Sequence, residues 1–206
     1  MSLTTRLISG TQLSGYFDEL AALRIKVFRE YPYLYDGTLE YEANYLETYF
    51  QSEQAMAIIA FYEDRNGGTG NDERIVGAST GVPMNHESLE FRQPFEQQGI
   101  DTSQVFYCGE SILLPEYRGK GLYRRFFKGR ENYAREQGFT QTAFCAVVRS
   151  EQHPLKPTNY QPLDKVWKHF GYKPKTGLTT NYDWKDIDQP ETRSHEMQFW
   201  LKNLEG

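Results

Sequence analysis

The sequence predicts one α+β domain spanning residues 1–206, in which helices pack on a mixed β-sheet. Helical and strand-like stretches alternate along the chain, and no linker rich in Pro, Gly or Ser separates them. A strand-like run at 105–114 is followed by a helical stretch at 119–137 and by a second strand-like run at 140–148. Such a strand–helix–strand crossover is right-handed and makes its two strands parallel. We therefore expect a parallel strand pair at the centre of the fold.

Apolar periodicity places a strand, two helices and a hairpin in the first half of the chain. In the first helix, for example, Phe17, Leu20 and Leu23 recur at helical spacing. The expected boundaries are a strand at 4–9, helices at 14–30 and 38–50, and hairpin strands at 55–62 and 74–84 joined by the glycine-rich loop 64–72.

In the second half, shorter elements surround the crossover. We expect a short helix and turn at 86–100, a short helix at 161–170, and two late strands at 178–184 and 197–201. Gly171 directly follows the helix at 161–170, and glycine at this position often ends a helix in the left-handed conformation.

Composition excludes several classes of protein. With 25% charged and 38% apolar residues the chain is globular rather than disordered. The net charge of −5 argues against a nucleic-acid binder, which usually has a broad basic surface. No apolar run approaches the ~18 residues of a membrane span, and no signal peptide is visible, so no membrane association and a cytoplasmic location are expected.

The cysteines and histidines show no pattern of a metal site or a disulfide framework. Cys108 and Cys145 both lie in apolar, strand-like runs, which predicts buried free thiols. The four histidines have no ligand spacing. Metal binding is therefore not expected.

The most informative stretch is 106–127, where a strand leads through a turn with two glycines into a helix. Gly119 and Gly121 let the backbone approach a ligand closely, and the free N–H groups and dipole of the helix N-terminus favour an anion. Arg118, Lys120 and Arg124 add positive charge. This arrangement is typical of a phosphate-binding turn.

The turn and the order of elements resemble the GNAT N-acetyltransferase superfamily over nearly the whole chain. The signature of that family, Gln/Arg-x-x-Gly-x-Gly/Ala, reads Arg118-Gly-Lys-Gly-Leu-Tyr123 here, after the lead-in Leu-Leu-Pro-Glu-Tyr at 113–117. Tyr123 replaces the usual small residue, which its backbone amide permits if the ring points away from the pyrophosphate. The resemblance implies a mostly antiparallel sheet whose parallel central strands splay apart to bind acyl-CoA.

The resemblance also implies acetyl-CoA as cosubstrate, without a metal, and an amine acceptor that attacks the thioester directly. Pantetheine would pair with the strand backbone, and the pyrophosphate would lie on the amides of the turn. The residues so implied in CoA binding are Ser111, Ile112, Leu113, Arg118, Gly119, Lys120, Gly121, Leu122, Tyr123 and Arg124.

Two groups are needed for proton transfer, a base for the amine and an acid for the CoA thiolate. Glu110 occupies a zone where family members often have an acidic residue, and desolvation in its apolar run would make it a stronger base. The alternative is a structural Glu110 that pairs with Arg149 or with a backbone amide. Trp167 stands where family members often have a tyrosine acid, and an indole N–H cannot act as one. Either Tyr160 protonates the sulfur, or CoA leaves as the anion.

The acceptor site is expected in the loop at 31–37, where Tyr33, Tyr35 and Asp36 would contact a cationic or aromatic amine. Tyr45 and Tyr49 are at helical spacing in the next helix, which favours the core. The acceptor is a small molecule or a peptide amine, and a homodimer is compatible with similar folds. The alternatives to an active enzyme are a catalytically weak CoA-binding or sensing module and an interaction domain of the same fold.

Overall fold

A computed structural model describes residues 2–63 and 73–204. Within them eight strands form one sheet, in the order β1-β2-β3-β4-β6-β8-β7, with β5 paired to β3 off this path. The strands are β1 (Ser2–Ser9), β2 (Met56–Glu63), β3 (Glu73–Pro83), β4 (Val105–Tyr107), β5 (Ser111–Leu113), β6 (Gln141–Val147), β7 (Lys173–Lys185) and β8 (Thr192–Asn203). The loop predicted at 64–72 lies outside the described residues.

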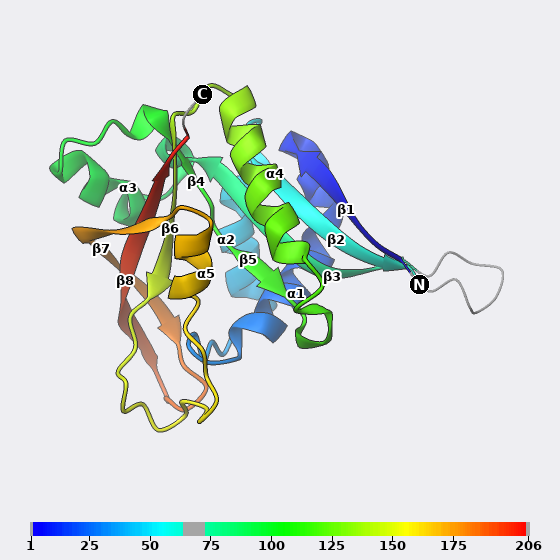
Figure 1. Ribbon diagram of the computed structural model, residues 1–206. Helices are drawn as coiled ribbons and strands as arrows, with labels where there is room; N and C mark the ends of the chain where they lie inside the picture. The colour runs from blue at the N-terminus through cyan, green and yellow to red at the C-terminus, as the bar shows by residue number, and fades with distance from the viewer. Residues whose placement is uncertain (1, 64–72, 205–206) are drawn as a thin grey trace.

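The sheet is mixed and mostly antiparallel, and its parallel pair is β4 with β6. Val105 lies opposite Gln141 and Tyr107 opposite Ala143 in this pair. The fold class and the parallel crossover predicted from the sequence are therefore confirmed. Past this pair, β5 and β6 diverge (Figure 1).

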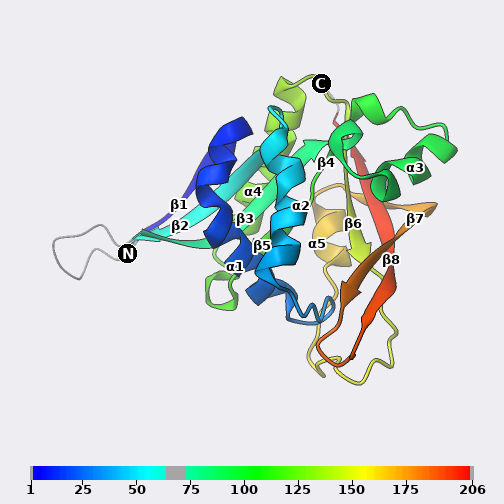
Figure 2. The same cartoon turned by 180° about the vertical axis from the view of Figure 1, so that it is seen from behind.

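Helices cover both faces of the sheet. The crossover helix α4 (Leu122–Glu136) and the short α5 (Asp164–His169) lie on one face (Figure 1), and α1 (Phe17–Phe28) and α2 (Leu39–Gln51) lie on the other (Figure 2). Helix α3 (Leu89–Gln97) lies beside β7. Short 3-10 turns occur at Gly10–Tyr16, Met84–His86, Thr102–Gln104 and Pro115–Tyr117. None of the described helices is long and apolar enough to cross a membrane.

The helices begin and pack as their sequences dictate. Helix α4 buries Phe126, Phe127, Arg130 and Tyr133, whose spacing of three and four residues places them on one face. Helix α2 is capped at its N-terminus by Thr38, whose hydroxyl accepts the backbone N–H of Tyr41 at 3.2 Å. The first helix differs from its prediction because its first turns are 3-10.

The run predicted as one strand at 105–114 is broken in two, and this prediction was wrong. The N–H of Cys108 still bonds to the carbonyl of Ala143 on β6 at 2.7 Å, but the carbonyl of Glu110 accepts the N–H of Thr80 on β3 at 3.1 Å. The chain therefore changes partner within three residues. Gly109 allows this, since a Cβ there would lie 1.9 Å from the Tyr49 hydroxyl.

Candidate active site

One edge of β5 faces the opening between the diverging strands. The backbone of Glu110 and Leu114 bonds to β3, through the N–H of Thr80 at 3.1 Å and the carbonyl of Val76 at 2.9 Å. Because backbone groups alternate in direction along a strand, the carbonyls of Ser111 and Leu113 point the other way, toward the opening. This is the edge to which an extended ligand could add.

Two side chains from the glycine turn and α4 contact this edge. The Tyr123 hydroxyl donates to the carbonyl of Ser111 at 2.9 Å, and Nε of Arg118 donates to the carbonyl of Leu113 at 3.2 Å. Nη2 of Arg118 also pairs with Glu30 at 2.9 Å. The tyrosine that departs from the family signature therefore bonds to the strand on which a ligand would lie.

The turn before α4 has the backbone conformation that the signature requires. Gly119 has φ +74° and Gly121 has φ +79°, in the left-handed region that side chains rarely adopt. No heavy atom lies within 4 Å of a Cβ built at either position. The backbone conformation, and not crowding, therefore requires glycine here, and the first amides of α4 are free of intrahelical partners.

A cleft of about 410 Å³ occupies the space between β5 and β6. Its lining includes Glu110, Ser111, Tyr123, Phe127 and Arg130 on one side, and Cys145, Val147, Arg149, Tyr160 and Trp167 on the other. The two residues predicted for proton transfer, Glu110 and Tyr160, therefore line the same cleft.

A smaller aromatic pocket of about 70 Å³ adjoins the cleft. The two share the lining residues Phe28, Tyr33, Gly109 and Cys145. The rest of the aromatic pocket is Arg24, Tyr35, Tyr41, Tyr45, Phe91, Tyr107, Tyr182, Trp184 and Met197. Burial raises the pKa of both Tyr33 and Tyr35, so their hydroxyls stay protonated.

Of the residues predicted to contact the acceptor, Tyr33 and Tyr35 line this pocket, but the structure does not bring Asp36 to it. The Asp36 carboxylate pairs with Arg29 at 3.0 Å and with Lys185 at 2.9 Å, and these hydrogen bonds lower its pKa. Tyr49 is buried as expected, whereas Tyr45 contributes to the pocket wall.

Hydrogen bonds of Arg149 and Trp184 fix the loop at 31–37. Arg149 makes two hydrogen bonds to Asp186, at 2.6 and 2.7 Å, and donates to the carbonyls of Pro32 and Tyr33, both at 2.7 Å. The indole of Trp184 also donates to Asp186, at 2.9 Å. The loop with Tyr33 is thereby tied to the ends of β6 and β7.

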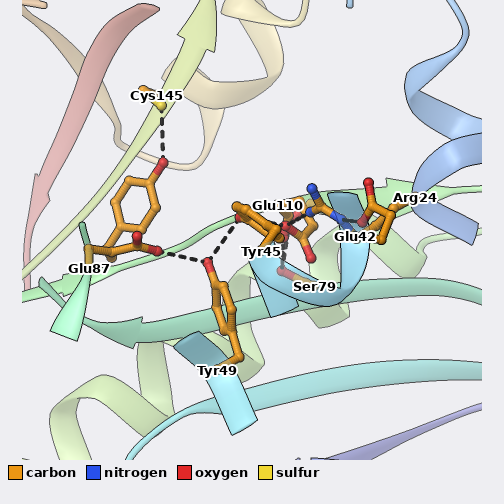
Figure 3. A network of polar contacts seen from close by, with 10 residues as sticks. Arg24, Glu42, Tyr45, Tyr49, Ser79, Glu87, Glu110 and Cys145 are labelled. Carbon is orange, nitrogen blue, oxygen red and sulfur yellow. Dashed lines mark hydrogen bonds and ion pairs between the residues drawn. The ribbon is translucent and has the colours of Figure 1, made fainter. Parts of the chain in front are cut away.

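Glu110 pairs with Arg24 of α1 and not with Arg149 (Figure 3). Arg24 lies between two carboxylates, since its Nε also bonds to Glu42 at 2.5 Å. Burial alone would lower the pKa of Arg24, but Glu110, Tyr45 and Glu42 together raise it well above its usual value. Arg24 is therefore a permanent buried cation beside the cleft.

The two cysteines are buried free thiols, as predicted. Burial raises the pKa of Cys108 to about 11 and that of Cys145 to about 12, so neither is a ready nucleophile. Among the described residues, no group of three or more His, Cys, Asp or Glu side chains is placed to bind a metal.

Several solved structures resemble the whole chain. A Desulfovibrio desulfuricans protein of the GNAT family aligns with TM-score 0.56 and 9% identity, covering 99% of this chain and 100% of its own. NAA60 of Arabidopsis thaliana, solved with a bisubstrate analogue, aligns with TM-score 0.58 and 13% identity over 98% and 99% of the two chains. Salmonella typhimurium yncA, solved with acetyl-CoA, aligns with TM-score 0.55 and 10% identity over 100% and 96%. The chain has the GNAT acetyltransferase fold. No protein-family model and no curated protein sequence matches it.

Trp167 and Tyr160 have different surroundings in this GNAT fold. Trp167 packs edge-to-face on Phe144 and Trp200, with ring centroids 5.1 and 4.9 Å apart, as part of an aromatic wall. Tyr160 packs on Tyr31 at 4.7 Å, and burial raises its pKa, which keeps the hydroxyl protonated. Tyr160 is therefore the one of the two with a proton to give.

Sequence reasoning missed two buried arginines of this GNAT fold. Arg130 is 2% exposed, donates from Nη1 to the Ser111 hydroxyl at 2.9 Å, and lies 4.1 Å from the ring centre of Phe127. Arg24 is 6% exposed. Both had a detectable signal, since each lies on the apolar stripe of its helix, three to four residues from buried apolar side chains.

Proposed function

We propose that this chain is an N-acetyltransferase that moves an acetyl group from acetyl-CoA to an amine. The supporting observation is the cleft between β5 and β6, whose lining includes Ser111 of β5 together with Tyr123 and Phe127 of α4, the helix that follows the glycine turn. Acetyl-CoA supplies the activated acetyl group. In this proposal Ser111–Leu113 pair with pantetheine, and the amides and charges of Arg118–Arg124 bind the pyrophosphate.

The amine is proposed to approach from the aromatic pocket and to meet the thioester where the pocket and the cleft share residues. A pocket walled by tyrosines, Phe91 and Trp184 suits an ammonium group or an aromatic amine. Its volume of about 70 Å³ admits only the reactive end of an acceptor. Asp36, a homodimer, a single domain over 1–206 and a cytoplasmic location remain predictions.

Glu110 is proposed to attract the ammonium group and to hold it while the group loses its proton. Oε2 of Glu110 bonds to Arg24 and accepts the Tyr45 hydroxyl at 3.2 Å. Oε1 is buried and has no hydrogen-bond partner among the described residues, so it is available to an N–H donor. Tyr160 is proposed to protonate the CoA sulfur, and the Arg130 guanidinium stabilises negative charge in the same cleft.

The test is a panel of amines with acetyl-CoA, in which turnover is followed as release of free thiol. We expect saturable release with at least one amine. Glu110→Gln should lower kcat about 100-fold, the lower end of what a group that assists proton transfer contributes, because the neutral amide no longer attracts the ammonium group, and it should leave the affinity for acetyl-CoA nearly unchanged. Glu40→Gln, an exposed carboxylate on α2, is the control and should behave like the wild type. Equal kcat in Glu110→Gln would refute this role.

A CoA-binding or sensing module is the second candidate, and Trp167 at the position of the usual tyrosine favours it. It predicts tight acetyl-CoA binding by calorimetry without thiol release across the same panel. A pure interaction domain predicts that acetyl-CoA does not bind at all.

A further inference from the structure

Another buried carboxylate, Glu87, lies close to the aromatic pocket but outside the machinery described so far. It precedes α3 and is 7% exposed. Oε1 lies 3.1 Å from the Tyr49 hydroxyl oxygen, within hydrogen-bond distance, and Oε2 accepts the backbone N–H of Ser88 at 3.2 Å. Within the described residues it forms no ion pair, in contrast to Glu110, which pairs with Arg24.

Hydroxyl groups connect the two carboxylates in a continuous chain (Figure 3). Tyr49 and Tyr45 lie 3.2 Å apart between their oxygens, and Tyr45 lies 3.2 Å from Oε2 of Glu110. With the 3.1 Å contact between Tyr49 and Glu87, three hydrogen bonds link four groups that have only two hydroxyl hydrogens. All three bonds can form together only when one carboxyl is protonated.

That proton belongs on Glu87. The Arg24 cation contacts Glu110 and stabilises its charged form, whereas no cation of residues 2–63 and 73–204 forms an ion pair with Glu87. The chain then runs in one direction, from the Glu87 carboxyl through Tyr49 and Tyr45 to the Glu110 carboxylate. When Glu87 loses its proton, the same hydroxyls can run in the opposite direction and deliver a proton to it.

Resting on the proposed function, we propose that Glu87 is the final acceptor of the proton that the acceptor amine loses, reached through Tyr45 and Tyr49. An ammonium N–H bond breaks as its proton passes to the Tyr45 oxygen. The Tyr45 hydrogen passes to Tyr49, and the Tyr49 hydrogen passes to Oε1 of Glu87. Each tyrosine gains one proton and loses one, the ammonium becomes the nucleophilic amine, and Glu87 changes from carboxylate to carboxylic acid. Glu110 keeps its charge and attracts the ammonium.

Electrostatics agrees with this geometry. Burial raises the pKa of Glu87 to about 7, and the charge of Glu110 adds to the rise, while the Ser88 N–H, the Tyr49 hydroxyl and Arg24 lower it. A carboxylate with this pKa is half ionised near neutral pH, as a base for an amine should be. The titratable and charged groups around Glu87 are Arg24 on α1, Tyr45 and Tyr49 on α2, Tyr107 on β4, Glu110 before β5, Cys145 on β6 and Tyr182 on β7.

Glu87 also has a route to solvent. It lines an open groove of about 240 Å³ with the polar residues Asn44, Thr48 and Ser88. This groove shares Tyr45 and other aromatic residues with the aromatic pocket, but the CoA cleft has none of its residues in common with it. A proton on Glu87 can therefore leave without passing acetyl-CoA.

The test combines NMR titration with pH–rate profiles. In protein with ¹³C-labelled glutamate carboxyls, we expect one carboxyl to titrate near pH 7 and to disappear in Glu87→Gln. In kinetics, kcat of the wild type should rise through pH about 7. Glu87→Gln and Tyr49→Phe should both lose this rise and have about 100-fold lower kcat at pH 8, with unchanged acetyl-CoA affinity. Tyr49→Phe should still show the Glu87 titration, which separates the relay from a merely structural role.

Glu90→Gln is the matched control, because Glu90 is an exposed carboxylate three residues away. It should keep the wild-type profile. Wild-type turnover with an unchanged profile in Glu87→Gln, or a Glu87 that titrates near the usual 4, would overturn the relay alone. Absence of thiol release from the wild type with every amine would instead overturn the proposed function.

Discussion

The strand edge and glycine turn proposed to bind acetyl-CoA, the donor half of the site, and the aromatic pocket proposed to bind the amine, the acceptor half, are built in different ways. The donor half comes from the continuous stretch 110–130, in which β5, the glycine turn and the start of α4 follow one another. The acceptor half takes its residues mainly from α1, the loop at 31–37, α2, α3, β4, β6, β7 and β8. The first half is mostly backbone, whereas the second is mostly aromatic side chains around the buried charges of Arg24, Glu42 and Glu110.

This difference predicts which substitutions should impair each half. A backbone site depends on the conformation of a few residues and tolerates many side chains, so a change at one glycine should remove it. A side-chain site assembled from distant elements depends on buried charges that hold those elements together, so its changes should act on stability as well as on chemistry.

The largest effect is expected in the donor half, from Gly121→Glu. The side chain would place bulk and negative charge where the pyrophosphate is proposed to bind, and it would strain a residue at φ +79°. Acetyl-CoA binding should become undetectable by calorimetry. Gly138→Glu is the control, since Gly138 has φ +85° and equally open surroundings at the other end of α4. It should bind like the wild type, and equal affinity in Gly121→Glu would contradict the proposed pyrophosphate site.

In the acceptor half, Arg24→Met should destabilise the fold. It leaves the buried carboxylates of Glu42 and Glu110 without their shared cation, and breaking such a pair typically costs about 3–5 kcal/mol. Urea denaturation measures the change in the free energy of unfolding. Arg6→Met removes the exposed pair with Glu73 and should leave the midpoint unchanged. Equal stability of the two variants would mean that Arg24 does not hold the acceptor half together.

The pH dependence of stability should reveal the raised pKa of Glu87. The folded protein keeps the Glu87 proton up to about pH 7, whereas an unfolded glutamate loses it near 4.5. Between these values the folded state binds more protons, so the free energy of unfolding falls as pH rises, by about 3 kcal/mol in total. In Glu87→Gln this loss should be absent, so its stability relative to the wild type should rise from pH 4 to pH 8. Urea titrations at both pH values decide this, with Glu40→Gln expected to follow the wild type.

The smallest effect is expected from Tyr123→Phe. In the free protein the Tyr123 hydroxyl bonds to the Ser111 carbonyl, which a pantetheine amide would need. Removing a competing hydrogen bond of about 1 kcal/mol should tighten acetyl-CoA binding about fivefold in calorimetry. Tyr133 lies on the same helix as Tyr123, and its hydroxyl bonds to the Gln54 carbonyl, so Tyr133→Phe is the control and should have no effect on acetyl-CoA binding. Weaker binding in Tyr123→Phe would show that the hydroxyl serves the ligand instead.

The same contrast explains what the sequence could predict. The glycine turn and the crossover are encoded in consecutive residues, so their positions and the fold class followed from local patterns. The break after β4 did not follow from local patterns. It depends on Gly109, where a side chain would collide with Tyr49, and Tyr49 is 60 positions earlier in the chain. The ion pair of Glu110 with Arg24 could not be predicted from local patterns either, since the two residues are 86 positions apart. Local patterns show that an arginine is buried but not which carboxylate it meets.

The short strand β5 also bears on aggregation. A strand edge with free backbone groups inside a sheet can recruit any extended chain, including a segment of another protein. Here the edge is only three residues long, and Tyr123 and Arg118 bond to its two outward carbonyls. An edge of this length offers too few hydrogen bonds to capture a polypeptide strand but enough for a short amide-containing ligand. The hydrogen bonds of Tyr123 and Arg118, which a cosubstrate would have to displace, thus also protect this edge of the sheet from pairing with strands of other proteins.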